Sequence, residues 1–349
     1  MPVSIVLGIE STCDETGVAL VRGTTELLAD VTATSMDEHA RYGGIIPEIA
    51  SRAHLHSFLP TMHAALEQAN ISLEDIDAIA CAAGPGLVGS LTVGISAAKA
   101  LALATGKPLY GVNHVIGHLA ISQLTSGPLP KPCIGLIVSG GHSNLLLINN
   151  IATEVKELGG TLDDAAGEAF DKVGRLLGLP YPGGPHVDKL SQQGDLDAIR
   201  FPRGLSAVKD KERYRYDFSF SGLKTAVARY VEGISEGDID ETLKANICAG
   251  FSEAINDSLT AKAVRAALDN GCETIVVGGG FAANSRLREL IGERAAKAGI
   301  EIRIPPMKHC TDNGAQIAAL GAAVFAAGAQ PSPITFSPDS SLPLDVITV

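Results

Sequence analysis

Residues 3–21 read VSIVLGIESTCDETGVALV: an apolar run, a polar turn and a second apolar run. Two apolar runs joined by a short polar segment are typical of a β-hairpin. The pattern recurs at residues 133–148, CIGLIVSGGHSNLLLI, where Ser and Gly form the turn. Two hairpins of one design, far apart in the chain, predict two lobes built on the same plan.

Helical and strand-like stretches alternate after each hairpin. Residues 47–69 and 95–104 predict helices, and residues 77–86 predict a strand. TIVVGGGFAANSRLREL, residues 274–290, predicts a buried strand, a glycine turn and a helix. This order is typical of a mixed α/β protein whose ligands gather at loop tips.

The composition is that of a folded protein of about two domains. The 349 residues are 46% hydrophobic and 19% charged, which gives enough apolar surface to offset chain entropy. With 27 basic and 39 acidic residues the net charge is −12, which argues against a general coat for nucleic acids or anionic membranes. Six cysteines without a Cys-x-x-Cys pair fit a reducing compartment. Without a leader sequence or a run of 18 apolar residues, we expect a cytoplasmic protein that does not enter membranes.

His114 and His118 lie four residues apart in NHVIGHLAISQL. On a helix this spacing puts both imidazoles on one face, where they either share a metal or line the helix as ordinary polar residues. Val115 stands where zinc peptidases of the His-Glu-x-x-His type carry their catalytic Glu, which argues against protease chemistry.

Asp312 in HCTDNGA is the best distant candidate for a third ligand. Two His and one carboxylate leave coordination positions open, which suits iron or zinc at a substrate site. The alternative is that Asp312 only caps the helix predicted at residues 316–326.

Three further groups of acids and glycines are candidates for ligand binding. Asp14 and Glu15, at the tip of the first hairpin, either position a metal, a water or an amine, or simply form a turn. Gly140 and Gly141 let backbone amides approach a phosphate. Residues 161–178 predict a helix with three carboxylates on one face, a solvated face or one offset by a ligand; they are Asp164, Glu168 and Asp171.

The segment 200–216 is basic within an acidic chain. Its six cations and two acids give a net charge of 6 − 2 = +4, and Tyr214 and Tyr216 lie among them. Such a segment either tracks a phosphate backbone and stacks a base, or is a solvated loop. The cations are Arg200, Arg203, Lys209, Lys211, Arg213 and Arg215.

Nine motifs, spread over nearly the whole chain, resemble the TsaD family of tRNA adenosine threonylcarbamoyltransferases. They are ESTCDETGVAL (10–20), YGGIIPEIASRAH (42–54), AGPGLVGSL (83–91), NHVIGH (113–118), VSGGHS (138–143), DDAAGEAFDKV (163–173), YPGGP (181–185), DFSFSGLKT (217–225) and CTDNGA (310–315). Two positions depart from the family pattern: Ile116 stands where an acid is frequent, and GGGFAAN replaces GGVSAN with Asn284 retained.

The resemblance implies an α/β fold of the actin, hexokinase and acetate-kinase type, with two lobes and duplicated ribonuclease-H-like cores. We expect an N-terminal lobe of residues 1–125, joined by the C-terminal helix and tail from about 323 to 349, and a C-terminal lobe of residues 126–322.

The resemblance also implies a ligand set. One divalent metal, Fe²⁺ first with Zn²⁺ or Mg²⁺ as alternatives, would be held by His114, His118 and Asp312. The nucleotide-linked substrate would be held by Ile137, Val138, Ser139, Gly140, Gly141, Asp171, Gly184, Asp188 and Asn284. Asp14 or Glu15 would orient or deprotonate the attacking amine.

The implied reaction transfers the threonylcarbamoyl group from threonylcarbamoyl-AMP to the exocyclic amine of adenosine 37, in tRNAs that read codons beginning with A. The implied partners are tRNA, a TsaB-like paralogue, a TsaE-like ATPase and a TsaC-type enzyme that supplies the intermediate; a homodimer is the alternative. Competing interpretations are an ATP-dependent sugar or acetate kinase of the same superfold, and a noncatalytic scaffold. The scaffold interpretation conflicts with the presence of both histidines.

Overall fold

The computed structural model describes residues 3–40, 42, 44–207, 210–234 and 239–349. The chain divides into two compact units. The first comprises Met1–Lys131, Ile148–Lys156 and Pro305–Val349, and the second comprises Pro132–Leu147 and Glu157–Ile304. The chain therefore returns to the first unit at Pro305, ahead of the return near residue 323 that the sequence indicates, and the whole C-terminal helix belongs to that unit.

The first unit is built on a five-stranded sheet of order β3-β2-β1-β4-β5. Its strands are β1 (Ile5–Glu10), β2 (Glu15–Arg22), β3 (Glu26–Thr34), β4 (Ala78–Gly84) and β5 (Leu109–Asn113). β1 and β2 pair antiparallel from Ile5↔Arg22 to Glu10↔Gly17, which confirms the predicted hairpin. β1–β4 and β4–β5 are parallel pairs.

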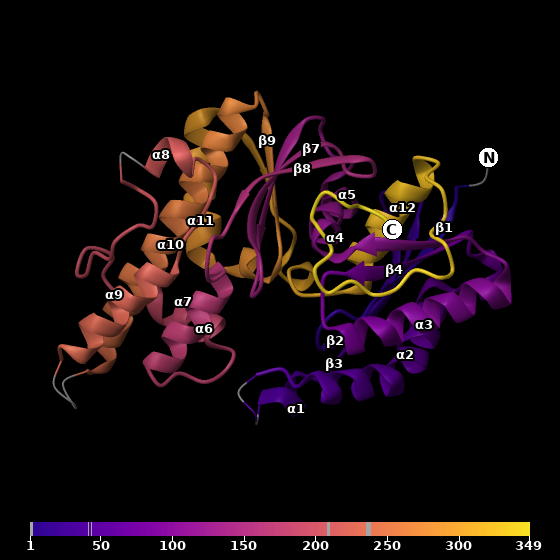
Figure 1. Cartoon of the computed structure of the whole chain (residues 1–349), viewed down its shortest axis with the longest axis horizontal. Helices are drawn as coiled ribbons and strands as arrows, with labels where there is room; N and C mark the ends of the chain where they lie inside the picture. The colour runs from indigo at the N-terminus through magenta and orange to yellow at the C-terminus, as the bar shows by residue number, and fades with distance from the viewer. Residues whose placement is uncertain (1–2, 41, 43, 208–209, 235–238) are drawn as a thin grey trace. The chain divides into compact units, whose positions relative to one another are not determined.

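Helices cover both faces of this sheet (Figure 1). They are α1 (Met36–Ala40), α2 (Pro47–Ala69), α3 (Val88–Thr105), α4 (His114–Ala120), α5 (Ser122–Ser126) and α12 (Gly314–Ala326), with short 3₁₀ turns at η1 (Leu73–Asp75) and η3 (Met307–His309). Successive strand residues face opposite sides. Gly8 of β1 lies against Ala318 of α12, and the next residue, Ile9, lies against Gly94 of α3, so β1 is buried from both sides.

Glycines of β1 and β2 permit the close packing of α12 on the sheet. A Cβ on Gly8 would lie 2.2 Å from the backbone nitrogen of Ala318, and one on Gly17 would lie 2.4 Å from that of Gly314. Only a residue without a side chain allows a helix to approach a strand so closely. This contact fixes the start of α12, and thus the loop before it, against the first hairpin.

The second unit repeats the plan with a sheet of order β10-β9-β6-β7-β8. Its strands are β6 (Cys133–Val138), β7 (Ser143–Asn150), β8 (Glu154–Gly160), β9 (Thr274–Gly278) and β10 (Glu301–Arg303). Read from β8, this order matches that of the first sheet strand for strand, with the β6–β7 hairpin in the place of β1–β2. The predicted duplication is confirmed.

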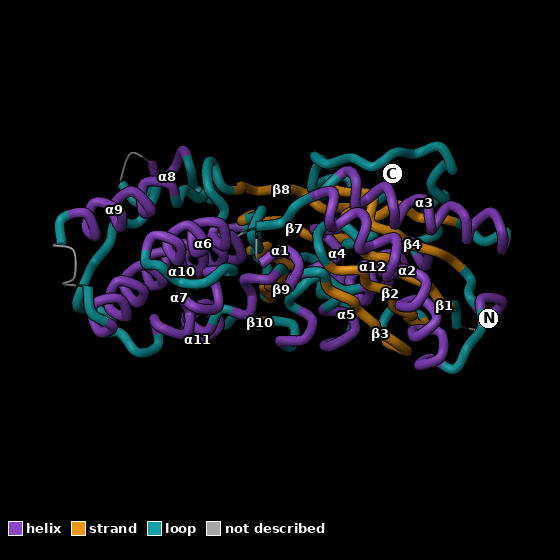
Figure 2. The backbone as a smooth tube through the Cα atoms, turned by 90° about the horizontal axis from the view of Figure 1, so that it is seen from below, coloured by secondary structure: helices purple, strands orange, loops and turns teal. Residues whose placement is uncertain are grey.

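The helices of the second unit form a layer beside its sheet, with α6, α7, α10 and α11 next to one another (Figure 2). They are α6 (Ala166–Leu176), α7 (Gly183–Ser191), α8 (Asp210–Arg213), α9 (Ser221–Glu232), α10 (Glu241–Asp269), η2 (Gly280–Ala283) and α11 (Ser285–Ala298). Phe170 of α6 contacts Phe251 of α10 and Phe281 of η2, with ring centroids 4.9 and 4.8 Å apart. This aromatic cluster fixes α6 against α10.

The helix predicted over residues 161–178 begins later, at Ala166. Thr161 uses its hydroxyl to donate to the Asp164 carbonyl at 2.6 Å, which holds the preceding segment in a turn. Asp164 therefore lies outside the helix, and its carboxylate binds Lys172 at 2.7 Å and Lys224 at 3.1 Å. The prediction that all three carboxylates share one helix face is therefore wrong for Asp164, and lysines offset the charge of Asp164 and Glu168.

Among the described residues, one helix, α3, is long and apolar enough to cross a membrane by length and composition alone. It packs against β4 and α2 as one of the covering helices of the first sheet.

The C-terminal tail, which follows α12, is hydrogen-bonded to β5. The Asn113 amide donates to the Ile347 carbonyl at 2.9 Å, and the Val349 amide donates to the Gly111 carbonyl at 3.0 Å.

Candidate functional site

The two predicted histidines lie on α4, which starts directly where β5 ends. The Asn113 side chain caps this helix by accepting from the amides of Val115 and Ile116 at 3.0 and 3.3 Å. His114 and His118 are thereby one helical turn apart, with ring centroids 4.9 Å from each other. The sequence-based prediction of a shared helix face is confirmed.

Asp312 reaches the histidines from the loop before α12. Its Oδ1 lies 3.2 Å from Nε2 of His118 and 3.6 Å from Nε2 of His114. The ligand atoms of the three residues all lie within 4.8 Å of one another. Asn313, not Asp312, caps α12, accepting from the Gln316 amide at 3.0 Å. The alternative role of Asp312 as an N-cap is therefore wrong, and its carboxylate faces the imidazoles.

A further buried acid, Glu10, contacts His114 at Nδ1, the ring nitrogen that does not face Asp312. Glu10 is 0% exposed, and its Oε2 lies 2.8 Å from Nδ1 of His114. The Gln316 amide also donates to the same Glu10 oxygen, at 3.1 Å. Sequence reasoning missed Glu10, although a carboxylate at the end of the otherwise apolar strand IVLGIE was a visible signal, since a buried charge needs a partner.

The donor set fits a divalent metal. Because Glu10 engages Nδ1 of His114, the Nε2 atom is the one directed toward Asp312, an arrangement found around many metal-bound histidines. Burial alone would lower the pKa of His114, but the carboxylates of Glu10 and Asp312 outweigh it and raise the pKa to about 9. Burial opposes ionisation of Asp312 as well, yet His114 and His118 hold its pKa below the ordinary range. A cation at this position would replace the protons that these groups otherwise share.

Ile116, one of the two departures from the resemblance, lies between the two histidines in sequence and is fully buried. Its side chain contributes to the core and adds no charge near the imidazoles. The acidic groups around the triad therefore come from the β1–β2 hairpin and the loop before α12.

Asp14 and Glu15 occupy the tip of the β1–β2 hairpin, as predicted. Asp14 is 5% exposed, and its Oδ2 is buried without a hydrogen-bond partner among the described residues. Burial, together with the carboxylates of Asp312 and Asp14, raises the pKa of Glu15 to about 10. The two neighbouring acids therefore differ: Glu15 favours its protonated form, and Asp14 presents an unpaired acceptor.

The β6–β7 tip of the second unit is a tight turn of small residues. The Ser139 amide donates to the His142 carbonyl at 2.8 Å, and the Gly141 amide donates to Oγ of Ser139 at 3.3 Å. Gly140 is left as the amide without a hydrogen bond inside the turn, and a Cβ added to Gly140 would meet open space. Ile137 and Val138 are fully buried in β6, so their side chains do not face a ligand.

The other predicted substrate residues meet in two pairs. Oδ1 of Asp171 accepts from the amides of Gly183 and Gly184 at 2.8 and 3.1 Å, at the start of α7. Asp188, further along α7, accepts from Nδ2 of Asn284 at 2.8 Å. Asn284 caps α11 in turn.

A buried amide outside the predicted set supports the second pair. Asn256 of α10 is fully buried and donates from Nδ2 to Oδ1 of Asn284 at 3.0 Å. This bond fixes which end of the Asn284 amide faces Asp188. Sequence patterns gave no signal for Asn256, because a single polar residue inside a long helix is not distinctive.

Most of the described arginines in the basic segment 200–216 form ion pairs within the protein. Arg203 binds Asp257 at 2.9 Å, and Arg215 binds Asp269 at 2.8 Å. The Tyr216 hydroxyl donates to the same Asp269 carboxylate, and Arg200 pairs with Asp197. Lys209 lies outside the described residues, as does the side chain of Lys211. For the described residues, the interpretation as a free phosphate-tracking strip is not supported.

Comparisons with known proteins identify the family of the chain. A family model described as "TsaD: tRNA N6-adenosine threonylcarbamoyltransferase" matches residues 26–319. The chain belongs to the TsaD family. Curated TsaD-type relatives named tRNA N6-adenosine threonylcarbamoyltransferase occur in Bifidobacterium adolescentis and Bifidobacterium longum. They are 54% and 53% identical to this chain over 345 residues, which cover 99% of both partners in each alignment.

Solved structures support the fold of this TsaD protein. HypF of T. kodakarensis superposes with a TM-score of 0.62 at 14% identity, covering 93% of this chain and 48% of HypF. Component A of the Acidaminococcus fermentans (R)-2-hydroxyglutaryl-CoA dehydratase superposes with a TM-score of 0.51 at 13% identity, covering 93% of this chain and all of that one. With the duplicated sheet order, these likenesses place the chain in the actin, hexokinase and acetate-kinase fold class.

Proposed function

We propose that this TsaD-family transferase acylates the exocyclic amine of adenosine 37 in tRNAs that read codons beginning with A, with threonylcarbamoyl-AMP as donor. Membership of the family carries the transferase activity and tRNA as substrate. The observation that carries the assignment of the site is the convergence of His114, His118 and Asp312, from two separate segments, within 4.8 Å.

The three residues would hold one divalent metal through Nε2 of each histidine and a carboxylate oxygen of Asp312. Two imidazoles and one carboxylate favour Fe²⁺ or Zn²⁺ over Mg²⁺, which prefers oxygen ligands. When bound, such an ion supplies Lewis-acid polarisation of a carbonyl or phosphate oxygen. Glu10 would keep His114 in the tautomer that leaves Nε2 available.

Asp14 is the residue we assign to the amine. The adenine N6 lone pair is delocalised into the ring, so acylation demands close orientation and a place for the proton. As N6 forms its bond to the carbamoyl carbon, the bond from that carbon to the phosphate oxygen breaks and AMP leaves. The N6 proton passes to the unpaired Oδ2 of Asp14. Glu15 is less suited to this role, because burial raises its pKa to about 10.

The second unit would hold the AMP portion of the donor. The Gly140 amide is placed to donate to a phosphate oxygen, because the other amides of its turn are already used. Asp171 and Asp188 would accept from ribose hydroxyls, each fixed in place by bonds to backbone amides or to Asn284. Ile137 and Val138 would serve only by placing this turn at the end of β6.

An acidic chain needs help to bind tRNA. A TsaB-like paralogue and a TsaE-like ATPase would assist this one, and a TsaC-type enzyme would supply threonylcarbamoyl-AMP; a homodimer is the alternative assembly. The net charge of −12 and the ion-paired state of residues Arg203 and Arg215 support a need for partners.

The test is nucleoside mass spectrometry of tRNA after incubation with the purified chain and threonylcarbamoyl-AMP, with and without the two partner proteins. Wild type and the exposed-site control Glu67→Ala should form N6-threonylcarbamoyladenosine and carry one metal ion per chain. Asp312→Ala should lose both. Retention of both metal and product in Asp312→Ala would show that the metal assignment is wrong.

A further inference from the structure

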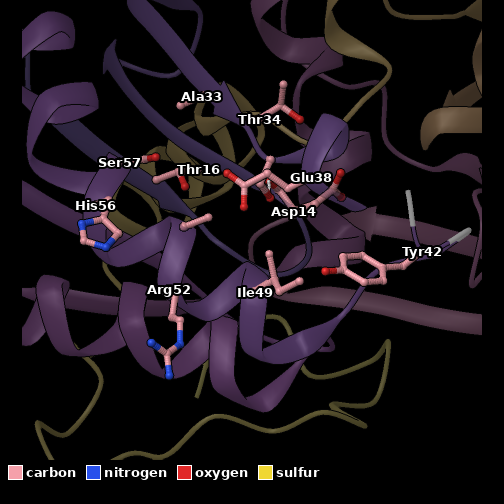
Figure 3. Close-up of a pocket in the computed structure, with 12 residues that line it drawn as sticks. Asp14, Thr16, Ala33, Thr34, Glu38, Tyr42, Ile49, Arg52, His56 and Ser57 are labelled. Carbon is pink, nitrogen blue, oxygen red and sulfur yellow. Dashed lines mark hydrogen bonds between the residues drawn. The ribbon is translucent and has the colours of Figure 1, made fainter. Parts of the chain in front are cut away.

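The first unit contains a cavity of about 550 Å³ on the α2 side of the β1–β2 hairpin (Figure 3). Strands β2 and β3 supply one wall, and α1 and α2 supply the other. This volume is in the range of small-molecule sites. The metal triad and the predicted AMP-binding residues are not among its lining residues.

Asp14 connects this cavity with the proposed reaction, because it is the residue assigned to accept the proton of the amine. It lines the cavity, and its backbone is fixed because the carbonyl accepts from both the amide and the hydroxyl of Ser35, at 3.1 and 3.0 Å. Its Oδ2 atom is nevertheless buried without a partner among the described residues. A buried carboxylate oxygen left unpaired is costly, so a ligand with an N–H or O–H donor is expected there.

The remaining lining selects the kind of ligand. Glu38 adds a second carboxylate, while the guanidinium of Arg52 is already bound to Glu48 at 2.9 Å. An anionic group such as a carboxylate or phosphate would therefore meet two acids, with the guanidinium of Arg52 paired to Glu48 and His56 as the other basic side chain of the lining. Ile49 and the ring of Tyr42 supply apolar surface (Figure 3), against which a planar heterocycle can stack.

We propose that this cavity receives the adenine base whose exocyclic amine is acylated, with N6–H donating to Oδ2 of Asp14. This inference rests on the proposed function and specifies where its acceptor lies. Because the base must enter a cavity of the protein, it has to leave its stack in the anticodon loop. The threonyl part of the donor, which carries a carboxylate, is the occupant that the two acids disfavour.

The experiment fills the cavity and compares the two substrates. Ile49→Trp places a bulky ring in the cavity, and Glu67→Trp, an exposed position on the same helix outside the cavity, is the control. For Ile49→Trp we expect kcat/KM for tRNA to fall about tenfold or more, because a misplaced base loses its reactive geometry. Binding of threonylcarbamoyl-AMP and metal content should match wild type, and Glu67→Trp should match it throughout.

A second probe reports the base itself. An anticodon stem–loop RNA with 2-aminopurine at position 37 has no 6-amino group but has a ring of the same size, so it reports entry of the base and not the bond to Asp14. It should brighten on binding to wild type and to Asp14→Asn, because the base leaves its stack, but not on binding to Ile49→Trp. A raised KM for threonylcarbamoyl-AMP alone would assign the cavity to the donor and overturn the proposal. Unchanged kinetics for both substrates in Ile49→Trp would overturn it too. A wild-type chain that forms no modified nucleoside would refute the proposed function, a distinct result.

Discussion

The two hairpin tips occupy equivalent places in two sheets of the same strand order, yet they are chemically opposite. The β1–β2 tip carries Glu10 and Asp14, which are buried, and Glu15, which is half-buried. Glu10 contacts the imidazole of His114, and Asp14 lines a cavity. The β6–β7 tip carries Ser139, two glycines and His142, has no acid, and is exposed at Gly140.

This difference shows how one scaffold provides two kinds of site. Buried carboxylates beside imidazoles attract a cation or an amine, because each isolated charge needs a partner. A neutral turn with an unengaged amide attracts an anion such as phosphate. Under the proposed function, duplication supplies the geometry, and the identity of a few tip residues determines which ligand each unit would take.

Removing a metal ligand from the acidic side should have the largest effect. We expect His118→Ala to lower the transfer rate more than about a thousandfold, because a bound ion supplies several kcal/mol of transition-state stabilisation. His63→Ala, an exposed histidine on α2, is the matched control and should keep the wild-type rate. Single-turnover rates of tRNA modification measure both. A small loss of transfer rate in His118→Ala would contradict the proposed role of the first unit in holding a catalytic metal.

Asp14→Ala should give the next largest effect. Loss of a positioned proton acceptor costs about a hundredfold or more in rate. Metal content should stay at the wild-type level, since Asp14 is not a member of the triad. Quench-flow kinetics with parallel metal analysis separate the two quantities. If Asp14→Ala lost its metal instead, the acid would belong to the metal site and not to the amine.

Glu10→Gln tests the support behind His114. The amide keeps the shape but removes the charge, so metal affinity should fall about tenfold, as is usual for the partners of ligating histidines. Competition with a metal chelator measures this affinity. An unchanged affinity would mean that Glu10 is not needed to orient His114. Oγ1 of Thr12 and Nε2 of Gln316, which each lie 3.2 Å from Nδ1 of His114, would then orient the ring.

On the neutral side, Gly140→Val should raise KM for threonylcarbamoyl-AMP severalfold, by crowding the amide that faces the phosphate. Open space around Gly140 means that the fold itself should tolerate the side chain. KM for tRNA and metal content should not change. Equal changes in both Michaelis constants would indicate a general structural effect.

We expect the smallest effect on activity from a change at Asp257, whose ion pairs stabilise the fold of the second unit. Arg203 and Arg294 hold the pKa of Asp257 below its ordinary value of 3.8, against the opposing effect of burial. A depressed pKa means that the stabilisation is present above pH 3.8 and disappears as the pH falls through the folded-state value. Asp257→Asn should therefore lower the unfolding free energy by about 1–3 kcal/mol at pH 7, and by less near pH 3. Denaturant unfolding at pH 7 and near pH 3 measures this free energy. An equal loss of unfolding free energy at both pH values would refute the ion-pair account.

Much of this organisation could be predicted from the sequence. The alternation of apolar and polar segments predicts both hairpins, and the four-residue spacing predicts a shared face for His114 and His118. Their meeting with Asp312 depends on α12 packing against β1 through glycines, which no local pattern reports. The polar cluster HCTDNGA made Asp312 a candidate ligand, and the motifs of the family resemblance agreed with it.

Other features were beyond local patterns. The start of α6 was misplaced because Thr161 and the lysine partners of Asp164 favour a turn over a helical start. Charge counting marked residues 200–216 as basic, but their partners Asp257 and Asp269 lie far along the chain. Glu10 and Asn256 act through contacts with distant residues, so their roles become visible only in the folded chain.

The most direct test of the central claim is the metal stoichiometry of two variants, one at the proposed metal site and one at the β6–β7 tip, after anaerobic loading with Fe²⁺ and, separately, with Zn²⁺. The account predicts one ion per chain for wild type and Gly140→Val, and none for the double variant His114→Ala/His118→Ala. One ion retained by the double variant would contradict the assignment of the metal to His114, His118 and Asp312.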